Sequence, residues 1–422
     1  MILAQTPIAR YCGPINMRIL GIETSCDETA VCLIEADGAF DAGFQCKVLG
    51  NALLSQIAVH APYGGVFPNL AKREHSRNLV PLLKQVLHDS GNQNVEVKNQ
   101  NDNAKFKNEI QKILNREIEL LEQLMPFLAE HERPDIDAIA VTHGPGLEPA
   151  LWVGVNFARA LSAAWDIPIV PVNHLEGHIA IAAMKMGESS YASLLQNTSI
   201  RGGLKTFEFP AIALLISGGH TELNLVREWP IFKTVGETRD DAVGEAFDKV
   251  ARMIGLPYPG GPEISRLATE ARGDDICSSE KLPRPMIHDN NFDFSFSGLK
   301  TAVLRLVKDK ALTETEKMGL AREFEDAATE VLVKKTMRAV EEYGAQTVLV
   351  GGGVSANTHI KSELKVALDE VGVALLYPPI GFETDNALMI ALAGYFHALN
   401  KEFTDISTLR ADGNLRLDSM LR

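Results

Sequence analysis

The sequence predicts an α/β protein built from two similar lobes with a cleft between them. The first observation is length, because 422 residues exceed the roughly 250 to 300 at which a single core stops growing. The second is a repeated order of expected elements, namely strand, strand, strand, helix, strand, helix, strand, helix, over 17–186 and again over 211–400. The third is a tight turn, rich in glycine or in hydroxyl groups, between the first two strands of each lobe.

The repeat divides the chain into lobes, insertions and ends. Residues 1–16 are interpreted as a leader outside the core, because Met17 opens the first expected strand directly. The other parts, in order, are a first lobe at 17–187 with an insertion at about 92–133, an inserted loop at 188–210, a second lobe at 211–400 with an insertion at about 255–312, and a C-terminal tail at 401–422.

Hydrophobic patterning places the elements of the first lobe. Apolar stretches predict strands at 18–23, 30–35, 48–60, 137–142 and 169–172. Helical spacing predicts helices at 70–88, at 151–165 and after the last of these strands. The insertion opens with the polar stretch GNQNVEVKNQNDN and continues as one amphipathic helix over 106–124, which we interpret as a decoration without chemistry.

The second lobe repeats the pattern with a longer interruption. Its strands are expected at 211–216, 221–227, 232–236, 347–350 and 373–377. Its helices are expected at 240–254, at 313–343, from the glycines at 351–353 to about 371, and from 385 onward. Thr313 and Glu316 form a capping box at the start of the long helix, and 255–312 is expected to be irregular and proline-rich.

Two histidines stand four residues apart just after the strand at 169–172. His174 and His178 would share one face of a helix, so both imidazoles can bind one ion. The same spacing is common on ordinary surface helices, and a metal site needs at least a third ligand. The best candidate is Asp385, which follows a turn containing proline and glycine and begins the last helix.

Three turns have the composition of anion-binding loops, in which backbone N–H groups point together. They lie at 24–29, which contains Thr24, Ser25 and Asp27, at 217–220 and at 351–353. One such turn would be an ordinary hairpin, but three in one chain favour a nucleotide ligand, the last because it opens a helix. Asn357, one turn into that helix, could reach a base or a ribose.

Asp248 lies on the helix that follows the third strand of the second lobe, and Gly261 lies in a tight turn shortly after it. The pair has two readings. In one, the acids of this helix complement its dipole and form a solvated face. In the other, Asp248 accepts hydrogen bonds from ribose hydroxyls while the turn brings the backbone close to the ligand.

The net charge limits which binding partners are expected, and the cysteine content indicates the redox state of the compartment. The formal net charge of −14 argues against non-specific coating of nucleic acid, so a nucleic-acid substrate would need a local basic patch or a partner protein. The cysteine count is odd at 5 and no CxxC pair occurs, which favours a reducing cytoplasm. No apolar run reaches the roughly 18 residues of a membrane span, so no membrane is expected.

Ten motifs together resemble one known family. In chain order they are GIETSCDETAV, HAPYGGVFPNLAKREH, the GPG turn, VNHLEGH, LLISGGHTEL, DDAVGEAFDK, YPGGP, DFSFSGLKTAV, GGGVSAN and ETDNALMIA. They are similar to the bacterial type of the tRNA N6-adenosine threonylcarbamoyltransferase family, formerly called the O-sialoglycoprotein endopeptidases. The resemblance runs from Met17 to Phe396 and departs from the family at the leader, at the insertion around 92–133 and at the loop at about 188–208.

The resemblance implies an actin and Hsp70-like (ASKHA) fold of two ribonuclease-H-like lobes. It implies transfer of a threonylcarbamoyl group from threonylcarbamoyl-adenylate to N6 of adenosine 37, in tRNAs that read codons beginning with A, with AMP released. His174, His178 and Asp385 would bind one divalent metal, iron or zinc. The adenylate would be held by Leu215, Ile216, Ser217, Gly218, Gly219, Asp248, Gly261 and Asn357, with Thr24, Ser25 and Asp27 as a further hairpin on the phosphate side.

The resemblance also implies partners, namely tRNA and two helper subunits, a degenerate paralogue and a small ATPase. AMP is a good leaving group, so positioning and charge stabilisation should matter more than a dedicated base, and we assign no catalytic acid or base.

Two other functions compete with the transferase reading. A zinc protease would carry H-E-x-x-H, with glutamate directly after the first histidine, whereas Leu175 follows His174 here. A sugar or acetate kinase, or an ATP-dependent chaperone, would share the fold. Neither of those needs a histidine pair with a distant aspartate.

Overall fold

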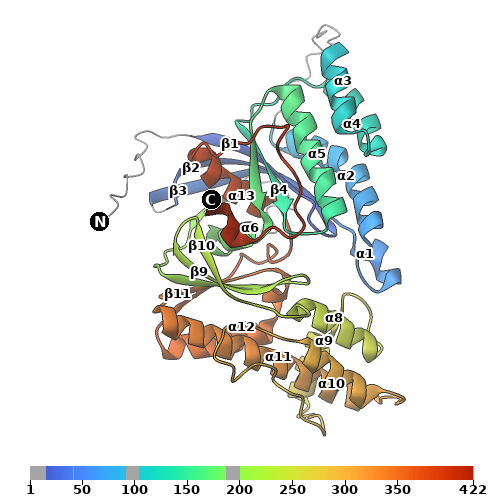
Figure 1. Ribbon diagram of the computed structural model, residues 1–422, viewed down its shortest axis with the longest axis vertical. Coiled ribbons are helices and arrows are strands. Elements are labelled where there is room, and N and C mark those ends of the chain that lie inside the picture. Colours follow the sequence, from blue (N-terminus) through green and yellow to red (C-terminus); the bar gives the residue numbers. More distant parts are fainter. Residues whose placement is uncertain (1–15, 41, 92–103, 187–199, 422) are drawn as a thin grey trace.

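The chain folds into two β-sheets with matching strand order (Figure 1). The computed structural model describes residues 16–40, 42–91, 104–186 and 200–421. The first sheet has the order β5-β4-β1-β2-β3-β7-β6, and the second has the order β10-β9-β8-β11-β12. The strands are β1 (Met17–Glu23), β2 (Glu28–Ala39), β3 (Ala42–Ser55), β4 (Ala138–Gly144), β5 (Ile169–Asn173), β6 (Met184–Met186), β7 (Ile200–Leu204), β8 (Ala211–Ile216), β9 (Thr221–Glu228), β10 (Ile231–Glu237), β11 (Thr347–Gly351) and β12 (Ala374–Leu376).

Strand directions match as closely as strand order does. β1 pairs antiparallel with β2 and parallel with β4, while β8 pairs antiparallel with β9 and parallel with β11. Three consecutive antiparallel strands extended on one side by two parallel strands form the ribonuclease-H-like sheet, and here it occurs twice. The expected fold class, an actin and Hsp70-like α/β protein with a repeated lobe, is confirmed.

Helices cover both faces of the sheets. Those that follow the first three strands and precede β7 are α1 (Ile57–His60), α2 (Pro68–Asp89), α3 (Ala104–Ile113), α4 (Ile118–Glu130), α5 (Glu148–Trp165) and α6 (His174–Ala183). Those after β10 are α8 (Val243–Met253), α9 (Gly260–Gly273), α10 (Ser297–Val307), α11 (Glu314–Tyr343), α12 (Thr358–Glu370) and α13 (Ala387–Leu399). Short 3₁₀ helices are η1 (Ala61–Tyr63), η2 (Gly353–Ala356) and η3 (Leu417–Leu421).

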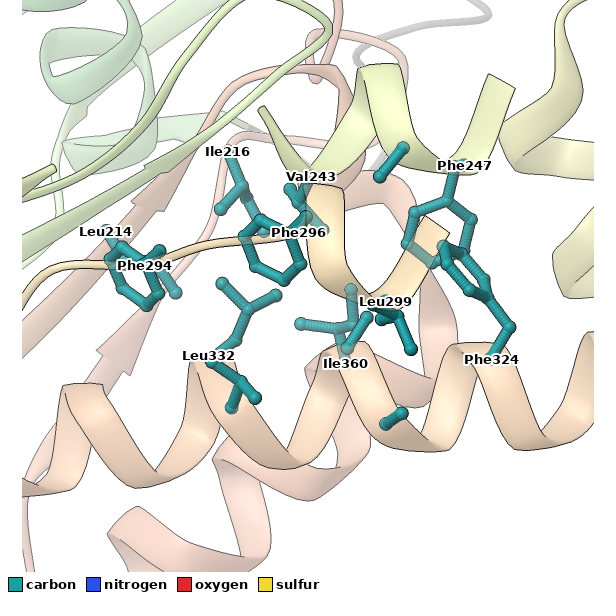
Figure 2. Close-up of a cluster of buried hydrophobic side chains, with 14 of the residues drawn as sticks. Leu214, Ile216, Val243, Phe247, Phe294, Phe296, Leu299, Phe324, Leu332 and Ile360 are labelled. Atoms are coloured by element: carbon teal, nitrogen blue, oxygen red, sulfur yellow. The ribbon is translucent and has the colours of Figure 1, made fainter. Parts of the chain in front are cut away.

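The core of the second lobe shows how the helices pack on the sheet. Leu214 and Ile216 from β8 face Phe296 and neighbouring side chains between the sheet and the long helix α11 (Figure 2). Phe247 on α8 meets Phe324 on α11 edge to face, with ring centroids 4.9 Å apart. Such an aromatic pair contributes about 1 kcal/mol beyond its buried area and holds α8 at a fixed distance from α11.

Two helices cross between the lobes. α13 follows the second sheet in the chain but packs on β1, β2 and β4 of the first sheet. α6 follows the first sheet but packs on β8 and β11 of the second, and α6 and α13 touch each other. Gly21 on β1 permits this contact, because a Cβ there would lie 2.4 Å from the carbonyl oxygen of Ala387. The expected ranges 17–187 and 211–400 are therefore interlocked rather than separate in space.

Several expected elements differ from the structure. The sequence places the third strand at 48–60, whereas β3 ends at Ser55 because the Gln56 N–H donates to Asp27 O and turns the chain into α1. The stretch 255–312 is not irregular throughout, since it contains α9 and α10. The single helix expected at 106–124 is two helices, because the chain turns at 114–117 and buries the side chain of Glu117.

The chain ends also depart from the expected parts. Residues 1–15 of the leader and 187–199 of the inserted loop lie outside the described residues, but 200–204 form β7 and extend the first sheet. The tail is not free: Thr404 bridges to Ile169 at the edge of the first sheet, and Leu417 packs into the core beside the second. The last helix begins at Ala387, with Asn386 as its N-cap, rather than at 385.

Candidate active site

The two crossing helices bring three ligand-type side chains together. His174 and His178 lie on α6, and Asp385 lies two residues before α13. The Asn173 side chain caps α6 by accepting a hydrogen bond of 2.9 Å from the Leu175 N–H, which fixes where the helix begins. The imidazole rings meet edge to face, with centroids 4.7 Å apart. The site therefore has ligands from both halves of the chain.

The donor atoms fit a single metal ion. One nitrogen of each imidazole and a carboxylate oxygen of Asp385 all lie within 4.8 Å of one another. Asp385 Oδ1 is 3.4 Å from His174 Nε2 and 3.1 Å from His178 Nε2. Tetrahedral zinc ligands with bonds of about 2.1 Å stand about 3.4 Å apart, so this spacing suits an ion between them.

The ring nitrogens of His178, which lack hydrogen-bond partners, give a second test of whether the cluster fits a metal ion. His178 is buried, and neither of its ring nitrogens has a hydrogen bond of good geometry to any described residue, although Nε2 faces Asp385. A buried polar atom without a partner costs free energy. A cation bound by Nε2 would remove that cost at one nitrogen, so the chemistry of the donor set agrees with its geometry.

Glu23, at the end of β1, is a buried carboxylate beside the cluster. Its Oε2 lies 3.4 Å from His174 Nδ1, and it accepts hydrogen bonds from the Ser25 N–H and from Thr142 Oγ1, each at 2.5 Å. A carboxylate on the second nitrogen of a ligating imidazole fixes the orientation of its ring. The sequence analysis missed Glu23, although a carboxylate at the end of an apolar strand was a usable signal.

Electrostatics set the charges of the three side chains. Burial alone disfavours the imidazolium of His174, but Asp385 and Glu23 outweigh it and raise the pKa of His174 to about 9. Burial lowers the pKa of His178. Burial acts to raise the pKa of Asp385, but the two histidines hold it well below its usual range. His174 therefore holds a proton near pH 7 unless a cation displaces it, because an imidazole must be neutral to bind a metal, whereas the ionised carboxylate of Asp385 is ready to bind one.

His220 is a further group that the sequence analysis left unassigned. It closes the turn after β8, where its N–H donates to Ser217 Oγ at 3.0 Å. Burial, together with repulsion from His174 and His178, lowers the pKa of His220 to about 4. The imidazole is therefore neutral near pH 7 and lies within electrostatic reach of the cluster.

The glycine turns of the second lobe meet one another. A Cβ on Gly352 would lie 2.5 Å from the carbonyl oxygen of Ile216, and one on Gly244 would lie 2.6 Å from that of Ser217. Gly218 and Gly219 face open space, with no heavy atom within 4 Å of an added Cβ. A Cβ on Gly351 would lie 3.0 Å from the Cβ of His178. The turns at 217–220 and 351–353 therefore adjoin the histidine cluster.

Asp248 and Asn357 have structural hydrogen bonds of their own. Asp248 Oδ1 accepts from the N–H groups of Gly260 at 2.7 Å and Gly261 at 3.3 Å, and so satisfies the start of α9. The Asn357 side chain caps α12 through Ile360 and also donates to Glu325 at 2.7 Å. Both side chains therefore have structural roles, and their contacts with a nucleotide stay predictions.

The hydroxyl-rich turn between β1 and β2 reaches the cluster from the first lobe. Ser25 Oγ lies 3.4 Å from Asp385 Oδ2. Thr24 points elsewhere, because its hydroxyl donates to the carbonyl of Ala150. Burial raises the pKa of Asp248, and the charge of Asp27 adds to that rise, whereas the hydrogen bonds from Gly260 and Gly261 oppose it. Of the three, Ser25 is in direct contact with an expected ligand.

Comparison with known proteins decides the family. The family model described as tRNA N6-adenosine threonylcarbamoyltransferase matches residues 47–98 and 118–392. Proteins of that name from Ralstonia pickettii and Persephonella marina are 42% and 38% identical to this chain. The first alignment covers 90% of each chain, and the second covers 96% of this chain and 97% of the relative. The chain belongs to this family.

Membership in the threonylcarbamoyltransferase family favours a transferase over the protease, kinase and chaperone readings. Residues 99–117, which include α3, lie outside the stretches that match the family model. The solved structure of full-length HypF in its phosphate- and nucleotide-bound form covers 92% of this chain and 48% of its own, with 13% identity and a TM-score of 0.48. At that level of similarity, the order and direction of the strands remain the evidence for the fold.

Proposed function

We propose that the chain transfers a threonylcarbamoyl group from threonylcarbamoyl-adenylate to N6 of adenosine 37, in tRNAs that read codons beginning with A. The proposal rests on family membership together with one observation. The His174, His178 and Asp385 cluster directly adjoins two glycine turns, through Gly351 on one side and the Ser217 turn on the other. A metal ion at the cluster would bind a carbonyl, and the glycine turns would bind a phosphate. An acyl-adenylate carries these two groups next to each other.

The reaction exchanges one acyl bond for another. The N6 amine attacks the carbamoyl carbon, a C–N bond forms, the C–O bond to the phosphate breaks, and AMP leaves. A divalent ion held by the cluster, Fe²⁺ or Zn²⁺, would supply a Lewis acid that polarises the carbamoyl carbonyl. Glu23 holds the ring of His174, and Ser25 lies against Asp385, so the first lobe orients the ligands.

The second lobe holds the adenylate in this proposal. The turn leaves open space beside Gly218 and Gly219, and their backbone N–H groups would donate to the departing phosphate, although the Gly219 N–H also donates to Ser217 Oγ at 3.3 Å. The residues assigned to the adenylate are Leu215, Ile216, Ser217, Gly218, Gly219, Asp248, Gly261 and Asn357, with Thr24, Ser25 and Asp27 on the facing hairpin. No side chain is assigned as the acceptor of the amine proton.

The partners follow from the substrate. The chain carries a formal charge of −14, so we expect weak binding of tRNA by the chain alone and stronger binding with two helper subunits, a degenerate paralogue and a small ATPase. Among the described residues, no helix has the length and apolar character needed to cross a membrane. We propose that the enzyme works in the cytoplasm, where its tRNA substrate is found.

The test is direct formation of the modified nucleoside. Threonylcarbamoyl-adenylate, a tRNA whose anticodon ends in U, the metal-loaded chain and bacterial helper subunits are mixed, and nucleosides are analysed by mass spectrometry. Product is expected with the wild-type chain and not with His174→Ala. A folded, metal-loaded wild-type chain that makes no product with these components would contradict the proposal, and ATP-dependent phosphorylation of a sugar or acetate would then be measured.

A further inference from the structure

A pocket of about 610 Å³ lies on the outer side of the first lobe, away from the histidine cluster. It is enclosed by α2, by α5 and by the turn that joins α3 to α4, three segments that lie side by side in Figure 1. The end of α3 and the turn after it, which together we call the inserted turn, contribute Lys112, Asn115, Arg116 and Glu117. Apart from Glu117, which begins the next helix as its N-cap, these residues project to solvent.

Most of the turn lies outside the stretches that match the family model. Residues 99–117 fall outside the matched stretches, and Lys112 and Arg116 are among them. The opposite walls, on α2 and α5, lie inside the matched stretches. The pocket is therefore made where an added segment packs onto the common fold.

The walls of the pocket are held by a buried polar contact. The side chain of Glu117 is only 1% exposed; its Oε1 lies 3.4 Å from Lys72 Nζ, and its Oε2 accepts from Asn156 at 3.3 Å. One carboxylate thus joins the inserted turn to α2 and to α5. A buried charge kept in place by two partners from other elements fixes the shape of the pocket.

The lining carries more positive than negative charge. Four cations, Lys72, Lys112, Arg116 and Arg159, face two carboxylates, those of Glu117 and Glu148. Within the described part of the chain, neither Lys112 nor Arg116 forms an ion pair. The whole chain has a net charge of −14, so a cavity whose lining has more cations than carboxylates differs in charge from the protein as a whole.

Arg159 lies at the inner wall without a carboxylate partner among the described residues. Its guanidinium donates to the backbone carbonyl of Ile406 at 2.7 Å and to Asn156 Oδ1 at 2.9 Å. Burial, followed by repulsion from Arg410, lowers the pKa of Arg159. Arg159 therefore adds to the pocket wall a guanidinium that could also bind an anion.

The positive surface extends beyond this pocket. A second hollow of about 220 Å³ shares Lys72, Arg116 and Glu117 with it and adds one cation, Arg73, and one carboxylate, Glu119, so that cations still outnumber carboxylates in its lining. The two hollows form a groove along the start of α2, which from here on we call the basic groove. A groove with spaced cations suits a polyanion better than a small anion, because successive phosphates can contact successive cations.

The basic groove is connected to the reaction centre by a short series of contacts. Glu148 is the first residue of α5, and the preceding Leu147 N–H donates to Ser25 O at 2.8 Å. Ser25 in turn lies 3.4 Å from Asp385. The groove therefore lies on the lobe that also brings Ser25 to the histidine cluster.

We propose that the basic groove binds backbone phosphates of the tRNA substrate, with Lys112 and Arg116 as its outer contacts. The inference rests on the proposed function, because that function supplies the polyanion. It explains how an acidic chain gains a local phosphate-binding surface. It also gives the end of α3 and the turn after it a role in binding.

The experiment measures equilibrium binding of fluorescently labelled, full-length tRNA to the whole chain by anisotropy, at about 50 and 200 mM salt. The combined Lys112→Ala and Arg116→Ala variant is expected to bind about tenfold more weakly at the lower salt. The slope of log affinity against log salt should become shallower by about 2, close to 1 for each lost phosphate contact. The matched control removes two exposed lysines from the other lobe, Lys308→Ala with Lys310→Ala, and should bind like wild type.

Two further variants separate charge from folding. Arg116→Lys keeps the charge and should retain most of the affinity, whereas Arg116→Glu should lose more than Arg116→Ala. Thermal unfolding of each should match wild type, because the side chain is exposed. Unchanged tRNA affinity in the double variant, or wild-type binding without salt dependence, would overturn the proposal. So would ATP that displaces tRNA in wild type but not in the double variant, because the groove would then bind a free nucleotide.

The binding measurement does not require turnover. If wild type makes no modified nucleoside but the double variant loses tRNA affinity, the proposed reaction fails while the groove remains a site for RNA. If product forms and the double variant binds tRNA like wild type, the groove fails while the reaction stands.

Discussion

The histidine cluster and the basic groove differ in how their residues are held. The cluster takes its ligands from two helices that cross between the lobes, and the side chains of His174 and His178 are 6% and 1% exposed. The groove takes its outer cations from an inserted turn open to solvent. Buried groups with fixed partners support chemistry, whereas exposed cations support adjustable binding. Changes at the cluster should therefore affect the rate, and changes at the groove should affect affinity.

The largest effect is expected at the cluster. Asp385→Ala removes a ligand that both imidazoles face, at 3.1 and 3.4 Å. Loss of several kcal/mol of charge stabilisation corresponds to at least about a thousandfold lower kcat/KM. Metal content, measured by mass spectrometry after dialysis, should fall as well. Circular dichroism should show a folded chain, and full activity in a metal-depleted Asp385→Ala protein would refute the assignment.

Glu23→Gln tests the carboxylate behind His174. The amide keeps the shape but loses the charge that orients the ring, so metal affinity should fall by about 10- to 100-fold. Competition with a coloured chelator measures that affinity. Glu35→Gln, at the other end of the same hairpin, should leave metal affinity unchanged. Equal losses in both variants would point to general damage of the sheet.

Gly351→Ala tests the contact between the glycine turn and α6. The new Cβ would lie 3.0 Å from the Cβ and the carbonyl oxygen of His178, so the ligand must shift by a few tenths of an ångström. Because a misplacement of about 1 Å can cost a hundredfold, we expect about a tenfold loss of kcat/KM. Gly353→Ala meets open space and serves as the control. Similar losses in the two variants would mean that the turn acts in some other way.

The histidine cluster was predictable because its signal is local. Spacing of four residues puts His174 and His178 on one helix face, and the structure confirms that Asp385 joins them in space. Glu23 was missed because its role depends on β1 and β4 ending side by side, which requires the sheet order. The groove was missed for a related reason, since its cations come from α2, α5 and an inserted turn. Each segment alone resembles an ordinary charged surface.

The crossing of α6 and α13 shows a different limit. The stretch ALMIALAGYFHAL is apolar on all sides, which predicts a buried helix but does not identify the sheet that buries it. Chain order suggested the second lobe, whereas α13 packs on the first. Glycines at the contact were the physical signal: Gly394 permits approach to Ala140 on β4, where an added Cβ would lie 2.3 Å from the Ala140 Cβ. The sequence alone does not show which strand residue lies opposite each glycine, because that depends on how the helix and the sheet pack in the fold.

The smallest effect concerns His397, which ties the crossing helices to the tail. Its Nε2 lies 2.9 Å from Glu176 on α6, and its Nδ1 lies 2.5 Å from Glu402. Burial opposes the imidazolium, but Glu176 and Glu402 outweigh it and raise the pKa of His397 to about 10. Because the folded pKa exceeds the unfolded value of about 6.5, this stabilisation is complete below pH 6.5 and is lost as the pH rises toward 10. After desolvation we expect it to contribute about 1 kcal/mol.

Urea unfolding of wild type and His397→Gln at pH 6, 8 and 9.5 measures that contribution. The difference in unfolding free energy should be largest at pH 6 and should shrink steadily as the pH rises. Tyr395→Phe removes a hydrogen bond to Gly38 from the same helix without a group that titrates near neutral pH, so its effect should not follow that course. A difference for His397→Gln that stays constant with pH would mean that packing, rather than charge, joins α13 to α6 at this point. The crossing would then be as insensitive to ionisation as the hydrophobic contacts around Gly21 and Gly394.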